Sequence, residues 1–243
     1  MARPRYPKHT GPPPPALPPV AQTVGQLVAE TLRLYGSRFV LALPLGLPLA
    51  LADQLTRADD WIESVVVLAA TSPIFTAGYV LASCLAHGAR PSARSVALAM
   101  LLGTVVFALA APLLAAYVIV GIAWLALFGH VVPAVIVEGR GARDAIRRAA
   151  EIARADYVHA VGGLATLVIL FYLTRILLEG LLRSQADNTR AVAVLLADVV
   201  LSPIVMLGGA LLFTNLAARV GVDRDERKRA RAEAMATMRG RSQ

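Results

Sequence analysis

Charged residues are scarce in this 243-residue chain, and cysteine is nearly absent. Asp, Glu, Lys and Arg make up 16% of the sequence, whereas a typical soluble domain carries about 25%. The shortage is concentrated in long apolar blocks, which excludes a soluble globule and indicates a polytopic membrane protein. Cys84 is the only cysteine, which excludes an internal disulfide and a cysteine-ligated metal.

Sequence motifs of common enzymes are also missing. The chain has no Gly-x-Ser-x-Gly, no phosphate-binding Gly-x-x-x-x-Gly-Lys, no His-Glu-x-x-His and no Cys-x-x-Cys. We interpret His130 and His159 as hydrogen-bonded residues near the inner ends of membrane spans, not as ligands. The sequence therefore predicts no enzyme, no cofactor and no metal. The N-terminus lacks the apolar core of a signal peptide, so we expect no cleavage.

The longest uncharged segment, residues 95–137, contains no Asp, Glu, Lys or Arg. As one helix it would be roughly 65 Å long, at about 1.5 Å per residue. The hydrocarbon core of a bilayer is only about 30 Å thick. We therefore predict two spans that form a hairpin, with the turn near Ala110-Ala111-Pro112.

The predicted fold is all-α, with six transmembrane helices plus two amphipathic interfacial helices. The first amphipathic helix covers Thr23–Phe39 and opens with a capping-box pattern, Thr23-Val-Gly-Gln26; a cytosolic extension of the first span is the alternative. The second covers Glu138–Asp156, where alanines lie opposite five arginines. The predicted spans are approximately residues 39–55, 65–86, 96–111, 113–137, 157–177 and 191–216.

Positive charge predicts the orientation, because cytoplasmic segments near spans are rich in Lys and Arg. Six spans with both termini in the bacterial cytoplasm place 20 of the 24 basic residues inside, whereas five spans place only 10 there. Residues 1–22 are then a disordered, proline-rich cytoplasmic arm, or a ligand for a proline-recognising partner. Residues 23–218 form the membrane domain, and residues 219–243 form a basic cytoplasmic tail.

The tail is predicted to contact anionic lipid headgroups, since clustered basic residues beside a span attract them. Topological anchoring is the alternative, and no nucleic-acid partner is expected. The contacting residues would be Arg224, Arg227, Lys228, Arg229 and Arg231.

Ionisable residues within spans are costly, and they mark candidate sites. Arg175 and Asp198 lie at matched depth in the fifth and sixth spans, and Glu179 is one turn from Arg175. Three interpretations remain open: a structural ion pair, a proton or substrate pathway, and side chains that extend to the outer surface.

One motif resembles a known bacterial family. Pro133-Ala-Val-Ile-Val-Glu138-Gly139 ends a span, and Ala145-Ile-Arg-Arg148 follows in an amphipathic helix. This pattern is similar to the membrane domain of glycerophosphoryl diester phosphodiesterases and of its stand-alone relatives of unknown function. The family often has Ser-Trp where this chain has Ala149-Ala150. A catalytic barrel would need roughly 250 more residues, so the resemblance implies the membrane fold without the activity.

Two functions from different classes follow. The first is a non-enzymatic membrane scaffold or accessory subunit that contacts anionic lipids, with a membrane-protein partner or a second copy of the chain. The alternative is a small-molecule or ion transporter that uses Asp198 and Arg175. An intramembrane enzyme is disfavoured because no paired catalytic set is present.

Overall fold

The fold is entirely helical in the residues that the structure describes. The computed structural model describes residues 22–55 and 61–241, and for residues 187 and 222–241 only the backbone. Five of its helices are long and apolar enough to cross a membrane, and a sixth crossing arises if a sharply bent helix pair counts as one span. The predicted class, an all-α polytopic membrane protein, is confirmed.

The N-terminal region forms the bent pair. Helix α1 (Val24–Ser37) begins at the predicted capping box, in which Thr23 and Gln26 each accept a hydrogen bond from the other's backbone N–H. Its buried face packs on α9 and α10. The chain then turns by 104° into α2 (Phe39–Ala42), the 3-10 helix η2 (Leu43–Gly46) and α3 (Leu47–Leu55). Pro44 and Pro48 each lack the N–H that a regular α-helix needs, which explains the irregular segment.

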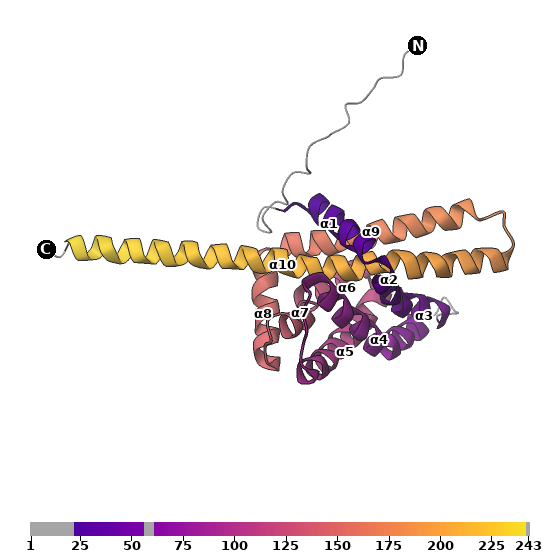
Figure 1. Ribbon diagram of the computed structural model, residues 1–243, viewed down its shortest axis with the longest axis horizontal. Helices are drawn as coiled ribbons and strands as arrows, with labels where there is room; N and C mark the ends of the chain where they lie inside the picture. The colour runs from indigo at the N-terminus through magenta and orange to yellow at the C-terminus, as the bar shows by residue number, and fades with distance from the viewer. Residues whose placement is uncertain (1–21, 56–60, 242–243) are drawn as a thin grey trace, which may run out of the picture.

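The remaining helices fold as hairpins with short connections. Figure 1 shows α9 and α10 running side by side along the longest axis, with α10 projecting beyond the other helices at its C-terminal end. The helices are α4 (Trp61–His87), α5 (Ala93–Ala116), α6 (Val118–Phe128), α7 (Val131–Ile136), α8 (Ala142–Ala155), α9 (Tyr157–Leu181) and α10 (Asp187–Arg241).

The central uncharged segment does form two spans, but its turn lies later than predicted. Helix α5 continues through Pro112 to Ala116, and the chain reverses at Tyr117, which has extended backbone angles. Proline is tolerated within membrane helices because neighbouring groups satisfy the freed carbonyl. Gly121 permits the tight reversal, because a Cβ atom there would overlap the Leu114 side chain.

Helix α10 also differs from the prediction at its C-terminal end. It continues as one helix past residue 219, where the sequence predicted a separate tail. The predicted disordered arm, residues 1–21, lies outside the described residues.

Two irregular helices cross at the centre of the fold. Pro203 in α10 has no N–H to donate to the Val199 carbonyl, four residues earlier. That carbonyl lies against Gly46 of η2, where a Cβ atom would overlap the Val199 backbone. The Tyr35 hydroxyl donates to the neighbouring Val200 carbonyl at 2.7 Å. The protein thus encloses the irregular backbone, as membrane depth requires.

The close crossing predicts that alanine substitutions at two glycines change the stability of the protein differently. Gly46→Ala should lower the free energy of unfolding by roughly 1–3 kcal/mol, because the added methyl group forces η2 away from α10. Gly36→Ala is the control, since no atom lies within 4 Å of its added Cβ, and helix propensity should raise stability by up to about 1 kcal/mol. Thermal unfolding in detergent measures both. Equal midpoints for the two variants would contradict the close crossing.

Candidate functional site

A cluster of four charged side chains joins α3, α9 and α10. Arg175 of α9 donates from Nη2 to Asp53 Oδ1 at 2.7 Å and from Nε to Glu179 Oε1 at 3.0 Å. Its Nη1 lies 3.5 Å from Asp198 Oδ1 on α10. One guanidinium thus faces three carboxylates. We call Arg175, Asp53, Glu179 and Asp198 the Arg175 cluster.

The exposed fraction of the side chain differs widely among the four members of the Arg175 cluster. The side chain of Glu179 is 42% exposed, that of Asp53 28%, that of Arg175 18% and that of Asp198 0%. Neither carboxylate oxygen of Asp198 has a hydrogen-bond partner among the described residues. A buried carboxylate held only by a distant ion pair carries a large desolvation cost. Such a cost is typical of functional positions in membrane proteins.

The exposed side of the Arg175 cluster opens on a cleft. We call it the outer cleft, after the orientation predicted from the positive charges; it has a volume of about 790 Å³, and both Asp53 and Glu179 line it. Its other polar lining residues are Arg183 of the connection between α9 and α10, and Asn188 and Arg190 of α10. Arg175 therefore stands between a polar cleft and a fully buried acid.

A second cavity lies beyond Asp198, toward the middle of the bundle. This central chamber has a volume of about 270 Å³ and is lined by mostly apolar side chains from α3, α4, α5, α6, α9 and α10. Tyr172, three residues before Arg175, lines it, and so does Ser202, four residues after Asp198. Residues three or four apart share a helix face. The chamber thus begins about one turn below the Arg175 cluster.

The sequence predicted three members of the cluster and missed one. Arg175, Glu179 and Asp198 come together as their depths in the spans suggested. We did not predict Asp53 as a site residue, and the structure places it in the last turn of α3. Its contact with Arg175 spans 122 positions. Only its position at the outer end of a span, level with Glu179, could have indicated it.

The residues of the family-like motif form a separate structural contact. Arg148 donates from Nε to Glu138 at 3.1 Å and 3.2 Å, which connects α8 to the end of α7. Arg140 pairs with the same carboxylate. Gly139 has φ +65°, a conformation that favours glycine. Pro133 is buried within α7. These residues fix α8 to the end of α7 and lie outside the Arg175 cluster.

His130 lacks the hydrogen bonds that we expected for it, whereas the ring of His159 has one. His130 is buried at the break between α6 and α7, and neither ring nitrogen has a hydrogen-bond partner among the described residues. It lines the central chamber. The backbone N–H of His159 donates to Asp156 Oδ1 at 3.1 Å, and its ring Nε2 is hydrogen-bonded to Arg219 Nη2 at 3.5 Å.

Two further predictions concern the lipid-contacting residues of the tail and metal binding. The side chains of Arg224, Arg227, Lys228, Arg229 and Arg231 lie outside the described residues. Among the described residues, no three His, Cys, Asp or Glu side chains are placed to hold a metal ion.

The Arg175 cluster predicts a large loss of stability when its cation is removed. Arg175→Gln leaves Asp198 buried without a partner, which should cost about 3 kcal/mol. For a chain of this size, the thermal midpoint should fall by roughly 6–12 °C. Arg183→Gln, in the outer cleft, should change stability by less than about 0.5 kcal/mol. Asp198→Asn added to Arg175→Gln should recover part of the loss. A similar small effect of both arginine substitutions would contradict the assigned role.

No protein-family model, curated protein or solved structure matches this chain. The resemblance to the phosphodiesterase membrane domain therefore stays a prediction.

Proposed function

We propose that this chain is a small, non-enzymatic transporter of the bacterial cytoplasmic membrane, with six spans and both termini in the cytoplasm. One observation carries the proposal. The Arg175 cluster connects a polar outer cleft to Asp198, which is fully buried one turn above the central chamber. A purely structural ion pair would need neither the cleft nor the chamber.

The charge balance of the Arg175 cluster supports a gating role. Three carboxylates compete for one guanidinium, so Arg175 can exchange partners without losing all of its ion pairs. Arg183 and Arg190 line the same cleft and offset the negative charge of the cluster, so the gating event in this proposal is uptake of one proton by one of the three carboxylates. Such uptake would weaken the attraction between α9 and α10 at this level. Arg175 would then swing toward Glu179 and Asp53 and open the chamber to the outer side.

The broken helices support the same role. Transporters commonly build their sites where interrupted helices meet near the middle of the bilayer. Here η2 and the Pro203 region of α10 cross beside Asp198, through the contact of Gly46 with Val199. Backbone breaks at this point allow the outer halves of the helices to move while the inner halves stay packed.

The proposal predicts water access to the central chamber. Ser202→Cys places a nearly isosteric thiol in the chamber, one turn from Asp198, in a Cys84→Ala background. We expect a small, membrane-impermeant thiol reagent added to the outer side to modify it at least about tenfold faster than Ser72→Cys. Ser72 is buried in α4 but does not line the chamber, so it is the matched control. Mass spectrometry of membrane vesicles measures the rates.

Equal, slow modification of the two thiols would overturn the transport proposal. Both serines are almost fully buried, so static burial alone predicts no difference between them. Faster reaction at Ser202→Cys thus requires opening of the chamber and not an exposed position.

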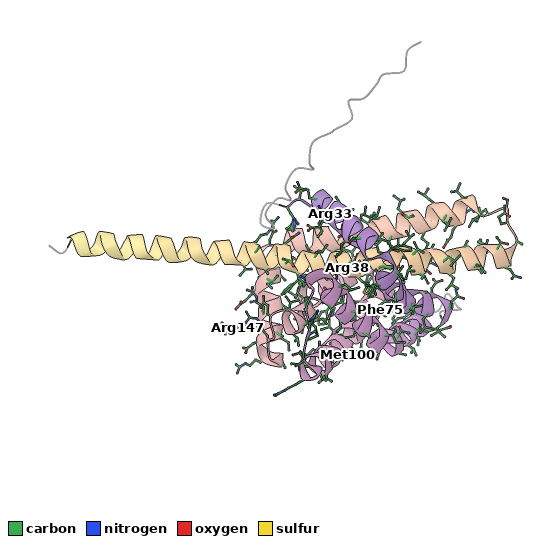
Figure 2. The ribbon with its side chains drawn as sticks, in the orientation of Figure 1. Arg33, Arg38, Phe75, Met100 and Arg147 are labelled. Carbon is green, nitrogen blue, oxygen red and sulfur yellow. The ribbon has the colours of Figure 1, made fainter. Side chains whose placement is uncertain are left out.

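A second candidate is a scaffold or accessory subunit that contacts anionic lipids, and helix α8 favours it. One face of α8 is buried on α6, α7 and α10, and the opposite face presents arginines. Arg147 is 78% exposed and projects from α8 away from the bundle (Figure 2). The Glu138–Arg148 contact fixes this basic face beside the inner ends of the spans.

This second candidate predicts charge-dependent lipid binding. Arg143→Gln with Arg147→Gln should weaken phosphatidylglycerol binding by about fivefold for each residue, since each contributes about 1 kcal/mol near a membrane surface. Native mass spectrometry with titrated lipid measures the affinity. Arg183→Gln, at the outer end, is the control and should have no effect. An equal loss for zwitterionic phosphatidylethanolamine would contradict a charge-based contact.

A further inference from the structure

The central chamber is suited to an apolar molecule and not to an ion. Its walls carry Phe75, Phe107 and Phe171 together with aliphatic side chains from six helices. Transfer of an unpaired ion into such surroundings is strongly unfavourable. Pockets that hold small molecules are typically apolar, with a few polar groups that orient the ligand. A ligand in the chamber would therefore be oriented by a polar group in its walls.

His130 is the lining residue whose buried polar atoms lack a partner; the other polar residues that line the chamber are Tyr79, Tyr172 and Ser202. His130 lies at the N-terminus of α7, where the chain breaks between α6 and α7. Both ring nitrogens are covered in this conformation, so a ligand would contact them after the ring turns. The exposed fraction of His130 is 3%, and the ring packs beside Phe213 with centroids 6.1 Å apart. Buried polar side chains nearly always have a hydrogen-bond partner, so one without any calls for an explanation. His130 has none on either nitrogen within the described part of the chain.

The chemistry of His130 indicates the class of ligand. A neutral imidazole has one donor and one acceptor nitrogen. A hydroxyl group matches both properties, because it donates one hydrogen bond and accepts others. A long apolar body would fill the space between His130 and Ser202, toward Asp198.

We propose that the central chamber binds an uncharged amphipathic molecule, with its aliphatic chain among the apolar walls and its hydroxyl group against His130. This inference rests on the proposed transport function and names its substrate class. The Arg175 cluster would then close the outer end of a site whose specificity is set at the inner end. The anionic cluster and the apolar chamber have separate roles: the first controls access and the second selects the ligand.

Binding of tritiated 1-decanol and decane to the full chain in lipid nanodiscs tests the inference. The signal is the saturable binding above that of empty nanodiscs. We expect one saturable decanol site and an affinity about tenfold higher for decanol than for decane, the effect of one net hydrogen bond. His130→Phe should remove this preference. Saturable binding of neither molecule, or equal binding of both to the unmodified chain, would overturn the inference.

A larger side chain inside the chamber tests whether the ligand binds there. Val168 lines the chamber from α9, whereas its neighbour Ile169 is 62% exposed on the outside of the bundle. Val168→Phe should weaken decanol binding at least about tenfold, and Ile169→Phe should leave it unchanged. Gly209→Ala is a milder filling variant, whose methyl group would meet the Tyr79 ring at ordinary contact distance. An equal loss in Val168→Phe and Ile169→Phe would place the site elsewhere.

The outcome can be separated from that of the transport proposal. Saturable decanol binding with an unreactive Ser202→Cys would support a static binding site and overturn transport. A reactive Ser202→Cys without decanol binding would support an opening chamber and overturn the proposed ligand class.

Discussion

The contact between Arg175 and three carboxylates is the constraint on which the arrangement of the outer half depends. Each of these charges would be costly in a bilayer by itself, and they are tolerated because α3, α9 and α10 bring them together. The cluster is nevertheless incomplete, since neither carboxylate oxygen of Asp198 has a hydrogen bond from the described residues. Stability alone would favour a fully hydrogen-bonded pair or an apolar contact. This buried acid is the observation on which the proposed function rests.

Irregular backbone makes this cluster possible. A regular first span could not approach α10 as closely as η2 does, because any side chain at Gly46 would meet the Val199 backbone. Pro203 leaves the Val199 carbonyl free at the same level. The hydrogen bond from Tyr35 then ties α1 to this point of α10. The buried acid, its cation and the irregular backbone thus lie close together, between the outer cleft and the central chamber.

Features that depend on neighbouring residues could be predicted from the sequence, and contacts between distant residues could not. The capping box at Thr23 and the apolar spans depend on neighbouring residues, so composition and spacing predicted them. The turn was misplaced because a proline was taken as a break, although α5 accommodates Pro112. The partnership of Asp53 with Arg175 depends on how distant helices meet. The same holds for His130, since only the assembled bundle decides whether its nitrogens find a partner.

We propose that the buried Asp198 communicates with the aqueous phase on the outer side through Arg175. Infrared difference spectroscopy on oriented membranes tests it most directly, with the external pH stepped and Asp198→Asn as the reference. We expect a carboxyl band that is lost in Asp198→Asn, changes with external pH and shifts within minutes when external water is replaced by D₂O. A spectrum without any change that depends on Asp198 would show that this acid is sealed from the outer phase, and would contradict the account.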